Sequence, residues 1–180
     1  MNMKKGIKFK RFNIRGQQIL GLSFGVIFSI FLIIFFIVIA FIVIKNFLQV
    51  QNCTRIGLFL EKFKADVKKT WNSQIDSHVF RGDLPSKIEY VCFVDITESV
   101  EGEFDYMENT VSLYKDKDVN LFFYPFSSAC EMPFHNIPHL DIDFIIAFNE
   151  NPFCIEVNKG TIFITVEKDL NEPLVNIYRA

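Results

Sequence analysis

The longest pattern along the chain is an uninterrupted apolar run. Residues 19–44 comprise 26 positions without Asp, Glu, Lys or Arg, and most are Ile, Phe, Val or Leu. As a helix rising about 1.5 Å per residue, the run would reach roughly 39 Å, against a hydrocarbon thickness of about 30 Å. It therefore predicts a transmembrane helix with some tilt. A cleaved secretory signal is the main alternative, but the apolar part of a signal spans only about 7 to 15 residues.

Beyond this run the spacing of apolar residues changes twice. It is first helical, at intervals of three and four, along Ile56, Leu60, Phe63, Val67 and Trp71. This stripe predicts an amphipathic helix that packs one side on a domain and leaves its Lys-rich and Glu-containing side in solvent. Residues 87–96 then alternate between apolar and other positions, which predicts a strand. Val91 and Phe93 make its second face apolar too, so the strand is expected to lie centrally in a sheet.

Shorter segments complete the prediction of one α+β domain. They comprise a turn at residues 81–85, a short helix at 103–114, a strand at 119–126, a proline-held loop at 130–141, an apolar run of undecided type at 142–148, a hairpin of strands 153–157 and 161–167, and a last strand near 174–178. The hairpin is expected to close through a three-residue loop in which Gly160 adopts positive φ. The predicted fold is a transmembrane helix continuing into an amphipathic helix, followed by a small, mostly antiparallel β-rich domain.

The charges divide sharply at the apolar run. Before it the chain carries six basic residues and no acid, namely Lys4, Lys5, Lys8, Lys10, Arg11 and Arg15. The remaining 13 basic residues and all 21 acidic residues follow it. Because positive segments are retained in the cytoplasm, we predict a cytoplasmic arm (1–18), a single span of the cytoplasmic membrane (19–44) and an extracytoplasmic domain (45–180). The basic arm can also contact anionic lipid headgroups, whereas an acidic domain argues against nucleic acid as a partner.

Four cysteines, Cys53, Cys92, Cys130 and Cys154, all follow the apolar run. An even number of cysteines in an outward domain predicts two disulfides, although four cysteines allow three pairings. We favour Cys53 with Cys92, which would tie the helix to the central strand, and Cys130 with Cys154. Four buried thiols without a bond are the alternative.

A zinc site is a further alternative for part of this set. Cys130, His135 and His139 have ligand-like spacing, and Cys154 could supply a fourth ligand. However, Pro133 and Pro138 interrupt the segment, and paired CxxC motifs are absent from the sequence. We therefore predict no metal site.

Motifs for catalysis are also missing from the sequence. Outside the apolar run it contains no GxSxG turn for a serine nucleophile, and it has no glycine-rich phosphate loop and no HExxH pair. The acidic cluster of Glu98, Glu101, Glu103 and Asp105 lacks the alternating order of a calcium loop and is expected to be a solvated loop. We predict neither an enzymatic activity nor a cofactor.

The junction before the apolar run has the order Arg15-Gly16-Gln17. A basic residue, Gly and Gln directly before a long apolar helix and an outward β-rich domain resemble archaeal type IV pilins and pilin-like proteins. The resemblance covers about 30 residues and implies cleavage by a membrane peptidase between Gly16 and Gln17, followed by packing of the helix in a filament. Many members carry Glu five residues after the cut, where this chain has Gly21. Small uncharacterised archaeal single-pass membrane proteins are similar in outline.

These patterns lead to two predictions of function. The first is a single-pass, membrane-anchored extracytoplasmic structural or binding module. The second is a processed, pilin-like filament subunit. The expected partners are the lipid bilayer and either further copies of the chain or another membrane or cell-surface protein.

Overall fold

The structure is a computed structural model that describes residues 17–130, 133–147 and 150–180, with side-chain surroundings from residue 24 onward. Residues 1–16 of the predicted cytoplasmic arm, including Gly16 of the possible processing site, lie outside the described residues, whereas the last two residues of the arm, Gln17 and Gln18, already belong to α1. The chain divides into two compact units, Met1–Phe47 and Leu48–Ala180, and each is described by itself.

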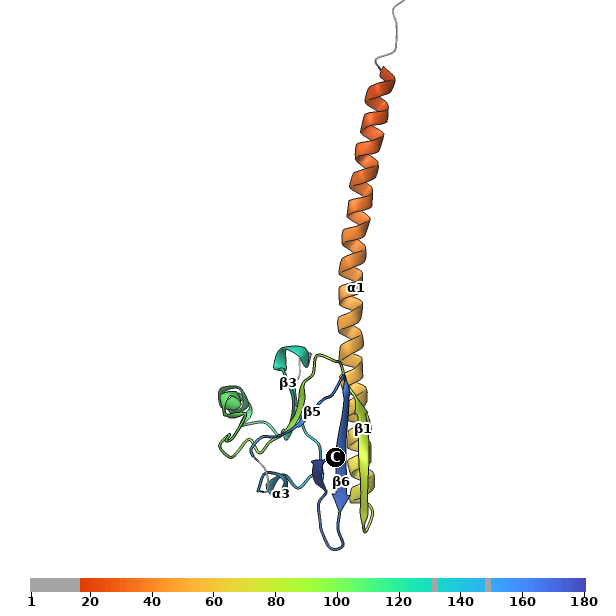
Figure 1. The fold of residues 1–180 in the computed structure, drawn as a ribbon. Helices are drawn as coiled ribbons and strands as arrows, with labels where there is room; N and C mark the ends of the chain where they lie inside the picture. The colour runs from red at the N-terminus through yellow and green to blue at the C-terminus, as the bar shows by residue number, and fades with distance from the viewer. Residues whose placement is uncertain (1–16, 131–132, 148–149) are drawn as a thin grey trace, which may run out of the picture. The chain divides into compact units, whose positions relative to one another are not determined.

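In the first unit, the structure describes one continuous stretch of α1, the helix Gln17–Trp71 (Figure 1). From Phe24 on, every side chain of this stretch is exposed, and an 18-residue window reaches a mean hydropathy of 3.5. Apolar side chains without protein cover need an apolar solvent, because exposing them to water costs about 25 cal/mol per Å². Among the described residues, this is the one helix with the length and composition to cross a membrane.

The second unit combines the rest of α1 with two antiparallel sheets, as the α+β prediction expected (Figure 1). The first sheet has the order β1-β6-β7, with β1 at Asp76–Asp83, β6 at Thr161–Lys168 and β7 at Asn176–Arg179. The second has the order β4-β3-β2-β5, with β4 at Phe134–His135, β3 at Leu121–Tyr124, β2 at Tyr90–Phe93 and β5 at Phe153–Glu156. The predicted strand at 87–96 is thus shorter than expected, but its interior position is confirmed.

The helical stripe predicted from sequence forms the core of the second unit. Ile56, Leu60, Phe63 and Val67 are buried and Trp71 is half-buried, while Phe59, which the stripe omitted, is 2% exposed. These side chains join one hydrophobic cluster with residues of both sheets.

The end of α1 is held by the first sheet. The Lys168 ammonium on β6 donates hydrogen bonds to the carbonyl oxygens of Trp71 (2.6 Å) and Ser73 (3.0 Å). The Trp71 indole N–H donates to the Pro173 carbonyl at 3.0 Å. A cation at a helix C-terminus satisfies carbonyls that lack intrahelical partners and complements the helix dipole.

The far face of the second sheet has a cluster of its own. A helical segment covers it through Phe104, Met107 and Val111, in three short pieces: η1 (Asp105–Met107), α2 (Glu108–Val111) and η2 (Ser112–Tyr114). This confirms the helix expected at 103–114. The undecided run at 142–148 contains a short helix, α3 (Ile142–Ala147). The loop expected at 130–141 contains a two-residue strand, β4. A short 3-10 helix, η3 (Phe126–Ser128), precedes this loop.

The turn expected at residues 81–85 is wrong in its first part. Arg81, Gly82 and Asp83 are the last residues of β1 and pair with Phe163, Ile162 and Thr161 of β6. Gly82 serves packing here rather than turning, because a Cβ at this position would collide with the Phe59 ring. The sequence suggested a turn since Gly and Asp are typical turn residues.

The hairpin expected around residues 158–160 is also wrong in its pairing. β6 pairs with β1 over eight positions, whereas β5 pairs with β2, so the two strands enter different sheets. What remains is a tight turn in which Asn158 and Thr161 exchange both backbone hydrogen bonds, leaving two residues in the loop instead of three. Because β1 has eight residues and β5 only four, β6 can form more backbone hydrogen bonds with β1 than with β5.

Gly160 provides a test of this turn. Its φ is +81°, as predicted, and an added Cβ would lie 2.8 Å from the Leu84 carbonyl oxygen. We expect Gly160→Ala to lower the free energy of unfolding by about 1–3 kcal/mol through backbone strain and this contact. Denaturant unfolding followed by the fluorescence of the single tryptophan, Trp71, measures the change.

Gly57→Ala is the matched control, since Gly57 lies in α1 and an added Cβ meets nothing within 4 Å. It should raise the free energy of unfolding by roughly 0.5–1 kcal/mol. Equal effects of the two substitutions would contradict the turn geometry.

Candidate functional site

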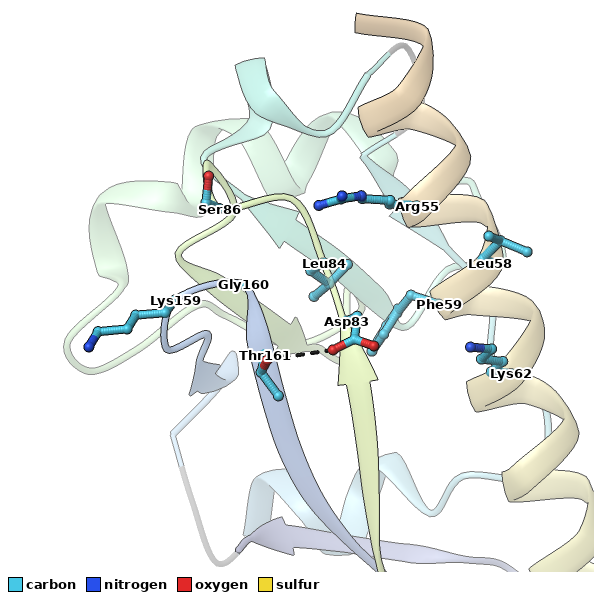
Figure 2. Close-up of a pocket in the computed structure, with 10 residues that line it drawn as sticks. All are labelled: Arg55, Leu58, Phe59, Lys62, Asp83, Leu84, Ser86, Lys159, Gly160 and Thr161. Carbon is cyan, nitrogen blue, oxygen red and sulfur yellow. Dashed lines mark hydrogen bonds between the residues drawn. The ribbon is translucent and has the colours of Figure 1, made fainter. Parts of the chain in front are cut away.

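A cavity of about 440 Å³ opens in the second unit where three segments meet (Figure 2). One wall is α1, a second is the loop that follows β1, and the third is the turn before β6. Its lining residues are Arg55, Leu58, Phe59, Lys62, Asp83, Leu84, Ser86, Lys159, Gly160 and Thr161. No comparable pocket was predicted from the sequence.

The walls of this pocket are fixed by backbone geometry. Lys159 and Gly160 both have positive φ, 50° and 81°, as a two-residue turn of type I′ requires. The Leu84 N–H donates to the Gly160 carbonyl at 2.8 Å and holds the turn against the loop after β1. Below them Phe59 and Leu84 are 2% and 1% exposed, so they form a rigid apolar floor.

The charges around the pocket are unbalanced. Arg55, Lys62 and Lys159 contribute three cations and Asp83 one carboxylate, which accepts a hydrogen bond from the Thr161 hydroxyl at 3.5 Å (Figure 2). In the described part of the chain, the ion pairs within 4 Å are those of His78 with Asp66 and Asp76, so none involves these three cations. The arrangement can hold an anion.

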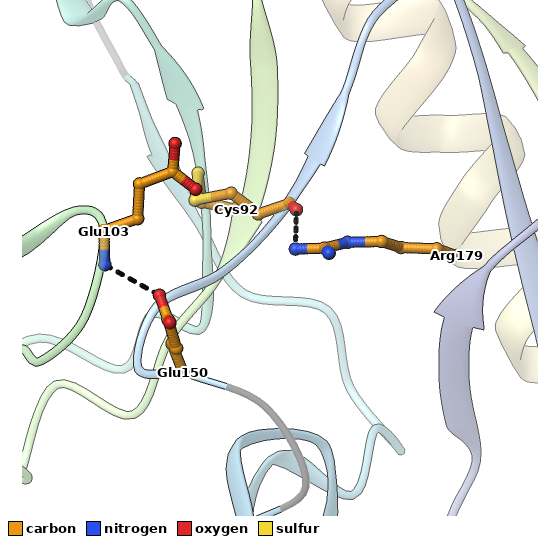
Figure 3. The surroundings of a disulfide bond; sticks show 5 residues. Cys92, Glu103, Glu150 and Arg179 are labelled. Atoms are coloured by element: carbon orange, nitrogen blue, oxygen red, sulfur yellow. Dashed lines mark hydrogen bonds between the residues drawn. A yellow bond between two sulfur atoms is a disulfide. The ribbon is translucent and has the colours of Figure 1, made fainter.

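A second cavity, of about 460 Å³, is acidic. Glu98, Glu101, Asp143 and Glu150 line it, together with Asn151. Glu150 is engaged, since it accepts a hydrogen bond from the Glu103 N–H at 2.7 Å (Figure 3). Asn151 is buried and donates to the carbonyls of Asp95 and Ser99, so it holds the loop that carries Glu98 and Glu101. The predicted acidic loop is thus one rim of a cavity.

Both disulfides expected from the cysteine count are present, but the favoured pairing is wrong. Cys53 bonds to Cys130, and Cys92 bonds to Cys154. Cys92 and Cys154 are directly opposite each other on β2 and β5. Figure 3 shows the surroundings of Cys92. Cys92 lies in the cluster on the far face of its sheet, whereas Val91 and Phe93 join the cluster that contains α1. Cys92 therefore points away from the helix and cannot reach Cys53.

The disulfides also engage two of the four residues of the zinc alternative. Cys130 and Cys154 belong to different disulfides, and the His139 ring stacks on Trp71 with 3.8 Å between ring centroids. Among the residues that the structure describes, no three His, Cys, Asp or Glu side chains are grouped to hold a metal ion.

A tyrosine cluster lies beside the far face of the second sheet. Tyr90 and Tyr124 come from β2 and β3, and Tyr106 from η1 contacts Tyr124 with 6.1 Å between ring centroids. Desolvation and a hydrogen bond with Tyr124 raise the pKa of Tyr106 to about 12. An unperturbed phenol is also neutral at physiological pH, so the shift does not change the charge of Tyr106, which contributes ring contacts with Phe104 and Tyr124 here.

The cationic residues of the first pocket were missed because each resembles an ordinary surface residue. Lys62 was assigned to the solvated side of the amphipathic helix. The available signal was the spacing of Arg55 and Lys62, seven residues or about two turns apart, with Phe59 between them on the same side. Nothing in the sequence placed Lys159 opposite them.

Comparison with known proteins identifies no family for this chain. Neither a family model, nor a curated protein, nor a solved structure matches the chain.

The disulfide pairing can be mapped directly. Mass spectrometry of a protease digest without reduction should find Cys53 linked to Cys130 and Cys92 linked to Cys154. Replacing Cys53 and Cys130 by Ser should lower the free energy of unfolding by about 2–4 kcal/mol, because that bond closes a long loop. Replacing Cys92 and Cys154 by Ala should lower the free energy of unfolding by more, since loss of these buried side chains also leaves a cavity. A peptide joining Cys53 to Cys92 would contradict the structure.

Proposed function

We propose that the chain is a single-pass membrane protein whose C-terminal domain is an extracytoplasmic structural or binding module. The observation that carries the proposal is the fully exposed apolar part of α1, which belongs to the same helix that enters the domain core. A lipid bilayer provides the solvent that this surface needs.

Two further observations support the outward orientation. The domain contains two disulfides, which persist in oxidising compartments and are rare in the cytosol. The basic residues before the span, with no acid among them, favour retention of the N-terminal arm in the cytoplasm.

Reporter fusions after Ala180 test the orientation. In a bacterial host, alkaline phosphatase at this position should be active and green fluorescent protein dark, because only the phosphatase matures outside the cytoplasm. Replacing the six basic residues of the arm by Gln should lower phosphatase activity and raise fluorescence, since the charge bias is lost. A fluorescent fusion of the unmodified chain would overturn the proposal.

A processed pilin-like subunit is the second candidate. It is supported by the Arg15-Gly16-Gln17 junction and by one long helix whose later part packs on antiparallel sheets while its apolar part stays exposed. Intact mass of the chain from a host with a pilin peptidase decides between the two. Loss of residues 1–16, abolished by Gly16→Leu, would favour the filament subunit, and an uncut chain would favour the permanent anchor.

A further inference from the structure

We propose that the pocket between α1, the loop after β1 and the turn before β6 binds a phosphate group carried on a small organic body. The inference rests on the proposed binding function and names the ligand class for it. The same chemistry could come from a soluble phosphate ester or from a phospholipid headgroup.

The charge of the pocket matches a phosphate ester. Arg55 and Lys62 on α1 face one carboxylate, Asp83, while the Lys159 ammonium points outward from the rim (Figure 2), so the pocket has a surplus of one positive charge. A phosphodiester carries about −1 and a phosphate monoester about −1.5 to −2 at neutral pH, so either can neutralise this surplus. The apolar floor lowers the local dielectric constant and so strengthens the Coulomb attraction between the cations of the pocket and a bound phosphate.

The donors suit a tetrahedral oxyanion. The Arg55 guanidinium extends from α1 toward the loop that carries Ser86 (Figure 2). Neither the Arg55 and Lys62 side chains nor the Ser86 hydroxyl makes a hydrogen bond within the described residues. Arginine binds phosphate through two parallel N–H donors, and lysine adds a point charge.

The remaining space predicts a ligand larger than inorganic phosphate. A volume of about 440 Å³ lies within the usual range of small-molecule sites. Phe59 and Leu84 can contact a carbon skeleton, while the Asp83 carboxylate can accept a hydrogen bond from a ligand hydroxyl. Glycerol phosphate has this combination and is also the core of a phospholipid headgroup.

The test uses the full chain in phosphatidylcholine nanodiscs, with glycerol phosphate as the ligand and sodium chloride as the ionic-strength control. Saturating glycerol phosphate should raise the thermal midpoint, followed by Trp71 fluorescence, by about 4 °C, because a ligand that binds only the folded state stabilises it. Isothermal titration should show binding that is at least about tenfold weaker in the double variant Arg55→Gln with Lys62→Gln.

The matched control is Lys64→Gln with Lys68→Gln, which removes the same charge from exposed positions of α1 that do not line the pocket. It should bind as the unmodified chain does. Equal binding by the two double variants, or a midpoint shift no larger than that caused by sodium chloride, would overturn the proposal.

Phosphatidylglycerol nanodiscs distinguish the two sources of phosphate. If a headgroup is the ligand, the unmodified chain should gain thermal stability in these discs without added ester, and the Arg55 and Lys62 double variant should not. A gain that requires the soluble ester in either lipid assigns a soluble ligand. The reporter fusions test orientation separately, so a failed binding test leaves the membrane topology intact and a wrong topology leaves the binding result intact.

Discussion

The packing of two phenylalanines of α1 determines how the second unit is built. Phe59 and Phe63 contact Phe80 of the first sheet at centroid distances of 5.8 and 5.1 Å. They also contact the second sheet, Phe59 through Phe123 at 5.8 Å and Phe63 through Phe93 at 6.0 Å. Full burial of one such ring contributes about 2 kcal/mol. An exposed ion pair contributes about 1 kcal/mol at most, so aromatic burial, not surface charge, holds the helix to both sheets.

This aromatic junction also explains several features that otherwise look unrelated. The ring of Phe59 occupies the space above Gly82, which is why a glycine is needed inside β1. The same ring forms the floor of the cationic pocket, so a residue of the core sets the depth of the candidate site. The two sheets are joined again away from the helix, where Arg179 of β7 donates to the Cys154 carbonyl at 3.1 Å and lies over the Phe153 ring.

Sequence patterns predicted the parts of the fold that depend on local periodicity. The stripe from Ile56 to Trp71 and the two apolar faces around Cys92 follow from helical and alternating spacing, and both are confirmed. The partner of β6 and the bond from Cys92 to Cys154 depend on which strands meet, since β1 and β6 are far apart in the chain. Periodicity carries no information on such pairings, and turn propensity alone led to the wrong hairpin.

The candidate site was hidden for a related reason. Its cations come from two segments about 100 residues apart, and each has the exposure of a normal surface side chain. The domain around them is acidic, which at first argues against an anionic ligand. However, at physiological ionic strength exposed charges are largely screened beyond about 8 Å, so carboxylates farther away than this contribute little to the potential at the pocket. Arg55 and Lys62 there outnumber the lining carboxylate, Asp83. Because neither Arg55 nor Lys62 forms an ion pair within the described residues, both are available for a ligand beside the apolar floor.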